Sequence, residues 1–486
     1  MRLFFDNTYE KLPEDFYARL TPTPVLKPDL VKLNCQISGR FGLDFNALNT
    51  KKGADIFAGN RVPQGAAPIS MAYGGHQFGG WAGLLGDGRA VLLGELFDVD
   101  GQRFDVQLKG AGRTPFSRTG DGRAWIGPVL REYVLSEALA ALGVPTTRAL
   151  AVVTTGENVM REDMFPGAVL TRIASSHVRV GTFEYFAARQ DVGSLRKLAD
   201  YVINRHYPDA SDKENPYLTF LDMVVGRQVD LIAKWMGVGF IHGVMNTDNM
   251  SISGETLDYG PCAFMDTYHP QTVYSSIDHM GRYAYQNQPE VAQWNLSRLA
   301  MAILPLIDPN EGVAAQTATN AIRAFSDLYN TAWSSLFGAK IGLVKKREGD
   351  RKLVEDLLHR MIANKMDFTQ TFRRLSHCAA QSPEGSGLRD ELAQLGEWMD
   401  KWRTRLGYED GNDAERQKTM CAVNPAYIPR NHRVEQMIEA ALKGDFSLFE
   451  RLNEVLSKPY EDQPQSSKYL SPPQPDEIVH NTYCGT

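Results

Sequence analysis

Three polar residues close together in the chain, Asp248, Asn249 and Asp258, have side chains that could bind a divalent metal and accept a proton. Mg²⁺ prefers oxygen ligands and takes few of them from the protein when phosphate and water supply the rest. Asn249 and Asp258 would supply two such oxygens. Asp248 is adjacent to Asn249 and cannot point the same way, so it is left to accept a proton from an attacking hydroxyl. An isolated Asp-Asn pair is also typical of a helix cap or a turn.

The spacing around these residues is that of a protein kinase catalytic loop with one part missing. Such a loop runs His-Arg-Asp-Leu-x-x-x-Asn, with the Asp as base and the Asn on a metal, and an Asp-x-Gly metal motif follows it. Here His242 and Asn249 hold the right spacing, and Asp258 opens an Asp-Tyr-Gly triplet. The base position holds Val244, which can neither accept a proton nor orient a hydroxyl. We therefore expect the base to have moved to Asp248.

A glycine-rich turn before a strand pattern could bind phosphate. Gly86 and Gly88 would let backbone N–H groups approach phosphate oxygens with no Cβ in the way, and Arg89 adds a fixed fork of donors. The plainer alternative is a hairpin turn, because Asp-Gly is a standard turn pair. Asp121 and Gly122 belong to a second Asp-Gly-Arg triplet, which is either a second phosphate cradle or another turn.

Three basic residues are candidates for the remaining phosphate contacts. Lys109 ends an alternating segment, and a kinase strand lysine holds phosphates and pairs with a downstream helix glutamate. Glu132 is the candidate partner and Glu137 the reserve. Arg172 and Arg179 suit a polyphosphate, because each guanidinium can bind bidentately. The alternatives are a solvated lysine at a strand end and two surface arginines.

The chain changes from a strand-rich, glycine-rich first part to a helical second part. Strand patterns span 90–95, 103–109, 149–154 and 168–173. Helical patterns span 128–142, 220–235, 291–306, 313–338, 351–376, 387–406 and 431–456. The proline-rich chain from Ser457 onward is expected to lack regular structure.

Bulk properties exclude several classes of protein. The 486 residues carry a formal net charge of −6 and no Lys/Arg-rich run, so no nucleic-acid partner is expected. No run approaches the ~18 apolar residues of a membrane helix, and early charged residues exclude a secretory signal. The five cysteines are scattered and lack CxxC pairs, which predicts neither a disulfide framework nor a zinc site. A reducing, cytoplasmic location is the expectation.

Taken together, a series of motifs resembles the SelO family, also called YdiU, which consists of kinase-like protein adenylyltransferases. A match of so many long motifs in order is highly specific. They run almost from end to end: Tyr-Gly-Gly-His-Gln-Phe-Gly (73–79), Leu-Gly-Asp-Gly-Arg (85–89), Leu-Lys-Gly-Ala-Gly (108–112), Thr-Gly-Asp-Gly-Arg (119–123), Gly-Val-Pro-Thr-Thr-Arg-Ala-Leu (143–150), Ser-His-Val-Arg (176–179), His-Gly-Val-Met-Asn-Thr-Asp-Asn-Met-Ser (242–251), Leu-Asp-Tyr-Gly-Pro (257–261), Asn-Pro (424–425) and Arg-Asn (430–431).

The resemblance, like the order of strands before helices, implies an α+β fold. We expect a protein-kinase-like two-lobe fold with an added N-terminal segment and C-terminal helices. The expected divisions are an N-terminal extension (1–60), a strand-rich N-lobe with the glycine-rich nucleotide loop (61–189), a helical C-lobe with the catalytic and metal motifs (190–310), a C-terminal helical region (311–456) and a flexible tail (457–486).

The resemblance also implies a reaction. Family members bind ATP flipped relative to active kinases, so that the α-phosphate faces the acceptor. AMP would then move from ATP onto a Ser, Thr or Tyr hydroxyl of a protein, with release of pyrophosphate. Transfer of UMP from UTP stays open, as does the choice between Mg²⁺ and Mn²⁺. The implied roles are Asp248 as base, Asn249 and Asp258 on the metal, Glu132 paired with Lys109, and nucleotide contacts from Gly86, Gly88, Arg89, Lys109, Asp121, Gly122, Arg172, Arg179 and Asp258.

Cys484 stands where animal relatives carry selenocysteine. It is either an inert tail thiol or one half of a redox switch. Some relatives have a partner cysteine further along the activation segment, where this chain has none, so Cys262 is the nearby candidate.

Two other functions stay open. One is an atypical protein kinase that transfers the γ-phosphate with Asp248 as its base. The other is a catalytically inactive nucleotide-binding pseudokinase, against which the retained metal ligands argue. The expected partners are ATP or UTP and acceptor proteins. The sequence fixes neither the acceptors nor the oligomeric state, for which a monomer is the working expectation.

Overall fold

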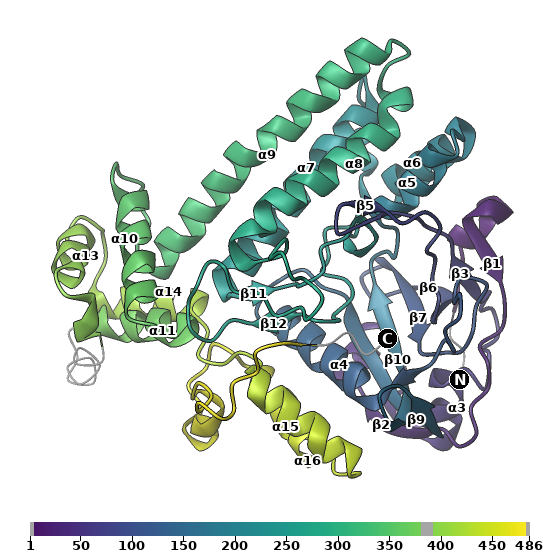
Figure 1. The fold of residues 1–486 in the computed structure, drawn as a ribbon, viewed down its shortest axis with the longest axis horizontal. Helices are drawn as coiled ribbons and strands as arrows, with labels where there is room; N and C mark the ends of the chain where they lie inside the picture. The colour runs from purple at the N-terminus through teal and green to yellow at the C-terminus, as the bar shows by residue number, and fades with distance from the viewer. Residues whose placement is uncertain (1–3, 381–391, 483–486) are drawn as a thin grey trace.

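The computed structural model describes residues 4–380 and 392–482, and within them the chain forms a mixed α/β structure with antiparallel sheets (Figure 1). The strands of the main sheet follow the order β1-β3-β6-β7-β10-β9-β2, and β8 pairs with β10. The strand patterns at 90–95, 103–109, 149–154 and 168–173 are confirmed as parts of four of these strands. The bounds are β1 (Tyr17–Arg19), β2 (Asp29–Leu33), β3 (Ile69–Met71), β6 (Ala90–Phe97), β7 (Arg103–Lys109), β8 (Ala124–Trp125), β9 (Arg148–Met160) and β10 (Met164–Ala174).

Within residues 4–60, three short helices cover one face of this sheet, and two strands, β1 and β2, belong to it. The cover consists of α1 (Cys35–Arg40), α2 (Phe45–Leu48) and α3 (Lys51–Phe57), each of which begins at a side-chain cap: Asn34, Asp44 and Thr50. Apolar side chains from these helices, such as Leu48 and Phe57, share a core with Leu108 of β7. The apolar side of the alternating segment 103–109 therefore faces this core.

The other face of the sheet carries α4 (Ile126–Ala141), behind which α15 (Asn431–Leu442) and α16 (Ser447–Leu456) pack (Figure 1). Leu130 and Val134 of α4 lie in one core with Leu170 of β10 and with Met437 and Phe449 of the two C-terminal helices. At the end of β7, Lys109 reaches α4 and pairs with Glu132.

The helical part is built around three long helices that run side by side, α7 (Pro216–Val238), α8 (Gln288–Ile307) and α9 (Glu311–Lys340) (Figure 1). None of the helices in the described part of the chain combines the length and the apolar character needed to cross a membrane. The other helices are α5 (Val180–Ala188), α6 (Val192–His206), α10 (Asp350–Ala363), α11 (Phe368–Cys378), α13 (Trp398–Leu406) and α14 (Asp413–Val423).

The end of α7 positions the loop with the candidate catalytic residues. Gly239, with φ +73°, ends the helix in the left-handed conformation that favours glycine. The chain then enters β11 (Phe240–Ile241), which pairs with β12 (Ala263–Phe264). The loop 242–262 is thus held at both ends by a short ladder. A second small ladder, β4 (His76–Gln77) with β5 (Gly80–Trp81), forms a hairpin near it.

Several predicted helices differ from those observed. The helix predicted over 351–376 is wrong as a single element, because the chain turns at Lys365 (φ +50°) and α11 starts from the cap Asp367. The helix predicted over 431–456 is likewise two helices, separated at Gly444 (φ +83°). Among the described residues, six helices lie outside the predicted helical ranges: α1, α2, α3, α5, α6 and α14. Part of the segment 387–406 lies outside the described residues, and its described part contains α13.

The prediction that the chain lacks regular structure from Ser457 onward is wrong for Pro464–Tyr469, which forms a 3-10 helix. Tyr469 is buried, and the next residue, Leu470, accepts a hydrogen bond from Arg430 Nη2 at 3.0 Å. The segment is therefore held by tertiary contacts, among them the hydrogen bond from the buried Arg430, and not by its own periodicity.

Candidate active site

The predicted site residues lie around one cleft with a volume of about 810 Å³. A cleft of this size suits a nucleotide-sized ligand. The predicted nucleotide, metal and base residues that line it are Gly86, Gly88, Arg89, Lys109, Asp121, Gly122, Arg172, Arg179, Asp248, Asn249 and Asp258. Their roles remain predictions, but residues spread over more than 170 positions of sequence meet in one place.

Three cations surround Asp258. Its Oδ1 lies 2.9 Å from Lys109 Nζ and 2.8 Å from Arg172 Nη2, and its Oδ2 lies 3.6 Å from Arg179 Nη2. Burial alone would raise the pKa of Asp258, but the three cations outweigh burial and hold that pKa well below its usual range. Glu132 completes the cluster, at 2.6 Å from Lys109 and 2.9 Å from Arg172. The three cations therefore share three carboxylates, those of Asp258, Glu132 and, beside Arg179, Asp87.

The strand register explains why Lys109 and Arg172 meet. β7 pairs with β10 so that Lys109 faces Leu170 and Gln107 faces Arg172. Cross-strand partners and alternate residues share a face of the sheet, so both cations project towards Glu132 on α4. The alternative of two surface arginines is wrong, because Arg172 and Arg179 are each only 2% exposed.

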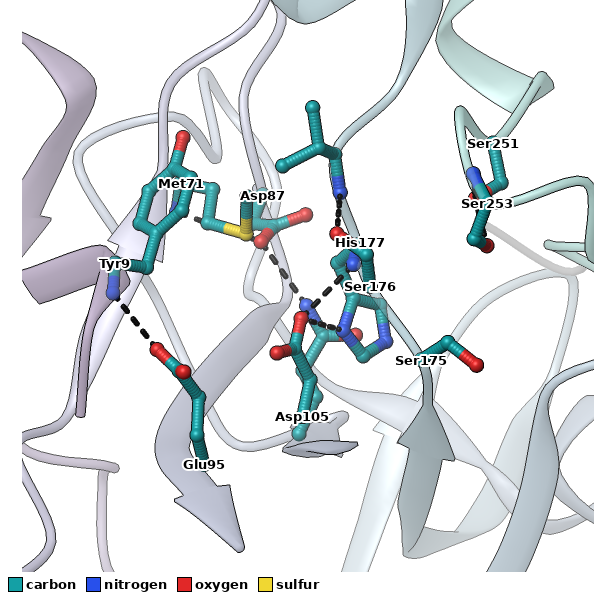
Figure 2. A network of polar contacts seen from close by, with 12 residues as sticks. Tyr9, Met71, Asp87, Glu95, Asp105, Ser175, Ser176, His177, Ser251 and Ser253 are labelled. Atoms are coloured by element: carbon teal, nitrogen blue, oxygen red, sulfur yellow. Dashed lines mark hydrogen bonds and ion pairs between the residues drawn. The ribbon is translucent and has the colours of Figure 1, made fainter. Parts of the chain in front are cut away.

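A buried polar network holds the segment that carries Arg179 (Figure 2). Asp105 of β7 accepts a hydrogen bond from the backbone N–H of His177 at 2.8 Å, and its carboxylate lies 3.0 Å from the Nδ1 of the same residue. The carbonyl oxygen of His177 accepts from Arg179 Nη1 at 3.1 Å. Asp87 lies 3.5 Å from that nitrogen, and the Tyr73 ring lies 4.3 Å from the guanidinium carbon. The guanidinium is therefore oriented by the protein itself.

Unpaired donors and a close turn in the cleft fit a phosphate-bearing ligand. Arg172 Nη1 and Arg179 Nε are buried and have no hydrogen-bond partner within the described ranges, which is a costly state for a donor. Gly86 has φ +73°, and a Cβ there would come within 2.2 Å of the Phe116 ring. At Gly88 a Cβ would lie 2.9 Å from the carbonyl oxygen of Phe116. The turn can pack this closely only with glycine at both positions.

His242 and Asn249 shape the loop between β11 and β12. His242 is buried, and its Nε2 lies 2.9 Å from the carbonyl oxygen of Leu257. Asn249 Nδ2 donates to the carbonyl oxygen of Val244 at 3.0 Å, which turns the amide oxygen to the opposite side. That oxygen and the Asp258 carboxylate remain the predicted metal ligands. In residues 4–380 and 392–482, no three His, Cys, Asp or Glu side chains are grouped to hold a metal ion.

Asp248 lies on the 3-10 turn Thr247–Asn249 and is only 8% exposed. Burial raises the pKa of Asp248 to about 6, although Gln77 Nε2 opposes this by donating to Oδ2 at 3.2 Å. Oδ1 is buried and has no hydrogen-bond partner in the described part of the chain. Such a carboxylate is ionised at neutral pH and basic enough to assist removal of a hydroxyl proton.

Two predicted residues have partners of their own. Glu137, the reserve partner of Lys109, instead pairs with Arg148 at 2.7 Å. Asp121 lies on the cleft wall and pairs with Arg161 at 2.8 Å. A ligand that binds the backbone of Asp121, and not its carboxylate, would leave this ion pair intact.

Of the two cysteines proposed as a redox pair, Cys262 does not line the cleft, and the other lies outside the described residues. Cys262 is fully buried, and Cys484 falls beyond the described residues. The last described residue, Thr482, donates through Oγ1 to the carbonyl oxygen of Pro261, next to Cys262. The disulfide stays a prediction.

Sequence reasoning gave no role to Gln77 or Tyr73, both of which line the cleft. The density of glycines around them marked the segment as unusual, but no pattern indicated that it contacts the loop near Asp248. The contact spans 171 positions between Gln77 and Asp248, and nothing local predicts it.

A cation cluster, a glycine turn and a buried carboxylate in one cleft are the parts of an enzyme that transfers a phosphoryl or nucleotidyl group. Comparison with known proteins narrows this class. The model of the family described as Protein adenylyltransferase SelO matches residues 1–457. The chain belongs to the SelO family.

Several bacterial proteins are similar to it over their whole length. Protein nucleotidyltransferase YdiU of Rhizobium leguminosarum bv. trifolii (strain WSM2304) is 57% identical over 487 residues, covering 99% of this chain and 97% of that protein. The proteins of the same name from Bradyrhizobium diazoefficiens and Rhodopseudomonas palustris (strain HaA2) are 56% and 55% identical, with 99% of both chains covered in each case.

Proposed function

We propose that this protein transfers AMP from ATP onto Ser, Thr or Tyr hydroxyls of acceptor proteins and releases pyrophosphate. Membership of the SelO family supports nucleotidyl transfer onto proteins. The observation that carries the proposal is the position of Asp248: it lies in the same cleft as the cation cluster, while Val244 occupies the kinase base position.

The cleft residues can divide the work on ATP between them. Backbone N–H groups of the turn at Gly86 and Gly88, with Arg89 and Lys109, would bind phosphate oxygens. The unpaired donors of Arg172 and Arg179 would bind the outer phosphates. This assignment supports a flipped nucleotide, with its α-phosphate towards Asp248.

The metal site fits Mg²⁺ or Mn²⁺ with phosphate and water as the remaining ligands. Asn249 and Asp258 each offer an oxygen, and these ions usually take only one or two ligands from the protein in such sites. When bound, the metal would neutralise charge on the phosphates. Lys109 and Arg172 would then shift part of their interaction from Asp258 to phosphate oxygens.

In the transfer step, the acceptor hydroxyl gives its proton to the Asp248 carboxylate and its oxygen forms a bond to the α-phosphorus. The bond between the α-phosphorus and the bridging oxygen breaks, and the electron pair leaves with pyrophosphate. Arg172 and Arg179 stabilise the charge that develops on this leaving group, a preorganised electrostatic effect of the kind that dominates many enzymes.

The rest of the proposal concerns the setting of this reaction. A strand-rich part followed by a helical part, with the cleft between β6–β7 and the loop 242–262, supports the two-lobe, kinase-like arrangement and its expected divisions. We also propose a monomeric, cytoplasmic enzyme. UTP is an alternative donor, because the proposed contacts are with the phosphates and none of them distinguishes adenine from uracil.

Two labelled forms of ATP test the proposal. The protein is incubated with casein, Mn²⁺ or Mg²⁺, and ATP labelled at either the α- or the γ-phosphate. We expect label on casein or on the chain itself from α-labelled ATP only. Label from γ-labelled ATP would favour an atypical kinase, and binding without any transfer would favour an inactive pseudokinase. Competition with UTP measures the donor preference.

A further inference from the structure

We propose that Gln77 is a positioning residue for the base, and that its side-chain amide fixes the orientation of the Asp248 carboxylate. This inference rests on the proposed function, because it assigns Asp248 the part of the base. It adds the hairpin β4–β5, which lies far from the catalytic loop in sequence, to the reaction machinery.

The contact between the two side chains is direct. Gln77 Nε2 lies 3.2 Å from Asp248 Oδ2, and both residues line the cleft. The terminal torsion of an aspartate is soft, so the carboxylate plane is not fixed by the chain alone. Oδ1 has no hydrogen-bond partner in the described ranges. Within the described ranges, the Gln77 amide is the side-chain donor to this carboxylate, and we assign it the role of holding that plane.

The neighbours of Gln77 bind the side chains of the two residues that precede Asp248. The backbone N–H of His76 donates to Thr247 Oγ1 at 2.7 Å. The backbone N–H of Phe78 donates to Asn246 Oδ1 at 3.0 Å. Three consecutive residues of the hairpin thus bind three consecutive residues of the catalytic loop, with the side-chain amide in the middle aimed at the base.

The hairpin is itself anchored, so that it can act as a fixed support. His76 Nδ1 lies 2.5 Å from Glu184 Oε1 on α5, and the His76 ring packs 5.2 Å from that of Trp81. Gly75 lies so close to the loop that a Cβ there would come within 2.7 Å of Thr247 Oγ1 and 3.3 Å of the Asp248 nitrogen. The glycines of this segment permit the close approach that brings Gln77 to the base.

Orientation of the base matters for the chemical step and not for nucleotide binding. Proton transfer requires a carboxylate oxygen held within hydrogen-bond reach of the acceptor hydroxyl. The arginine, lysine and glycine groups proposed to bind the ATP phosphates lie on other elements: the 86–89 turn, β7, β10 and the N-cap of α5, where Arg179 lies. Loss of the Gln77 amide should therefore lower kcat and leave the KM for ATP almost unchanged.

The experiment compares two replacements of Gln77 with a distant control. Gln77→Met keeps the length of the side chain without a donor, and Gln77→Glu keeps its shape but places a carboxylate beside Asp248. Gln316→Met changes an exposed glutamine on α9 in the same way. Each protein is assayed with α-labelled ATP and casein, and binding of α,β-methylene-ATP with Mn²⁺ is measured by calorimetry.

We expect Gln77→Met to lower kcat by about 10- to 100-fold, a part of what general base catalysis contributes, with KM and analogue affinity within about twofold. Gln77→Glu should lower kcat at least as much, and Gln316→Met should match wild type. Because Gln77 acts through Asp248, Gln77→Met should cause no further loss in an Asp248→Ala background.

A Gln77→Met protein with wild-type kcat would overturn the inference, and so would a loss of analogue affinity equal to the loss of kcat. Full additivity with Asp248→Ala would also overturn it, since it would show that Gln77 acts by another route. These outcomes differ from failure of the proposed function, in which wild-type protein transfers no α-label at all.

Discussion

Replacement of Asp248 by asparagine should strongly lower the rate of transfer and yet stabilise the folded protein. The carboxylate is buried, its Oδ1 lacks a partner among the described residues, and the pKa of Asp248 is raised to about 6. An ionised group in these surroundings is a cost to the folded state at neutral pH. Asparagine has nearly the same size, carries no charge and can still present its oxygen to Gln77 Nε2.

The size of the expected change in the free energy of unfolding follows from the raised pKa of Asp248. An ordinary aspartate has a pKa of about 3.9, and each pKa unit corresponds to about 1.4 kcal/mol, so ionised Asp248 costs the folded protein ~3 kcal/mol at pH 7. Between about pH 3.9 and 6 the folded state binds more protons than the unfolded state. The cost is therefore absent at lower pH, is roughly half developed, at ~1.5 kcal/mol, at pH 5, and is complete above pH 6.

Urea unfolding of the metal-free and nucleotide-free proteins, followed by tryptophan fluorescence at pH 5 and pH 7, measures this effect. Asp248→Asn should raise the free energy of unfolding by about 1–3 kcal/mol at pH 7 and by about half as much at pH 5. It should also lower transfer by roughly 10²- to 10⁴-fold. The exposed Asp327→Asn on α9 is the matched control and should change neither quantity. A gain that is absent at pH 7, or equal at both pH values, would refute the reasoning.

Three further predictions concern the same cleft. The kcat of the wild-type protein should fall about tenfold per pH unit below about pH 6. The reason is that the carboxylate is the active form of Asp248 and the pKa of Asp248 is raised to about 6. A kcat that stays constant from pH 5 to pH 8 would contradict this. Mn²⁺ should bind at least about tenfold more tightly in the presence of α,β-methylene-ATP, as measured by calorimetry. Without nucleotide, Lys109 and Arg172 bind Asp258 Oδ1 and compete with the metal, whereas phosphates would bind these two cations instead. Equal Mn²⁺ affinities with and without the nucleotide would rule out this competition. Gly75→Ala should lower kcat by at least about tenfold, because the added Cβ would collide with Thr247 of the loop. The control Gly83→Ala also changes a glycine at positive φ, but its Cβ would meet open space, so kcat should fall by less than about threefold. Similar losses of kcat in both variants would point to backbone strain alone.

The sequence predicted those parts of the fold and the site that depend on residue type and on spacing over a few residues. The alternation over 103–109 predicted β7 and placed Lys109 on its polar side. The His242 to Asn249 spacing located the loop that the structure holds between β11 and β12. Glu132 was the first candidate partner of Lys109, and the structure contains that pair at 2.6 Å.

Features that depend on long-range pairing were not predictable in this way. The burial of Arg172 follows from the β7–β10 register, which no local pattern specifies. The contact of Gln77 with Asp248 requires a hairpin to reach a loop 171 positions away. The order of Pro464–Tyr469 arises from packing beside Arg430, against what its composition indicates. Tertiary contacts decide each of these cases.

The central claim is that ATP lies in this cleft with its α-phosphorus towards Asp248. A crystal structure of the protein with α,β-methylene-ATP and Mn²⁺ tests it most directly, because the methylene bridge prevents transfer without changing the length of the phosphate chain by much. We predict that the α-phosphorus is the phosphorus nearest to Asp248 and that the outer phosphates contact Arg172 and Arg179. A γ-phosphorus beside Asp248, or an empty cleft at millimolar nucleotide and metal, would contradict the account.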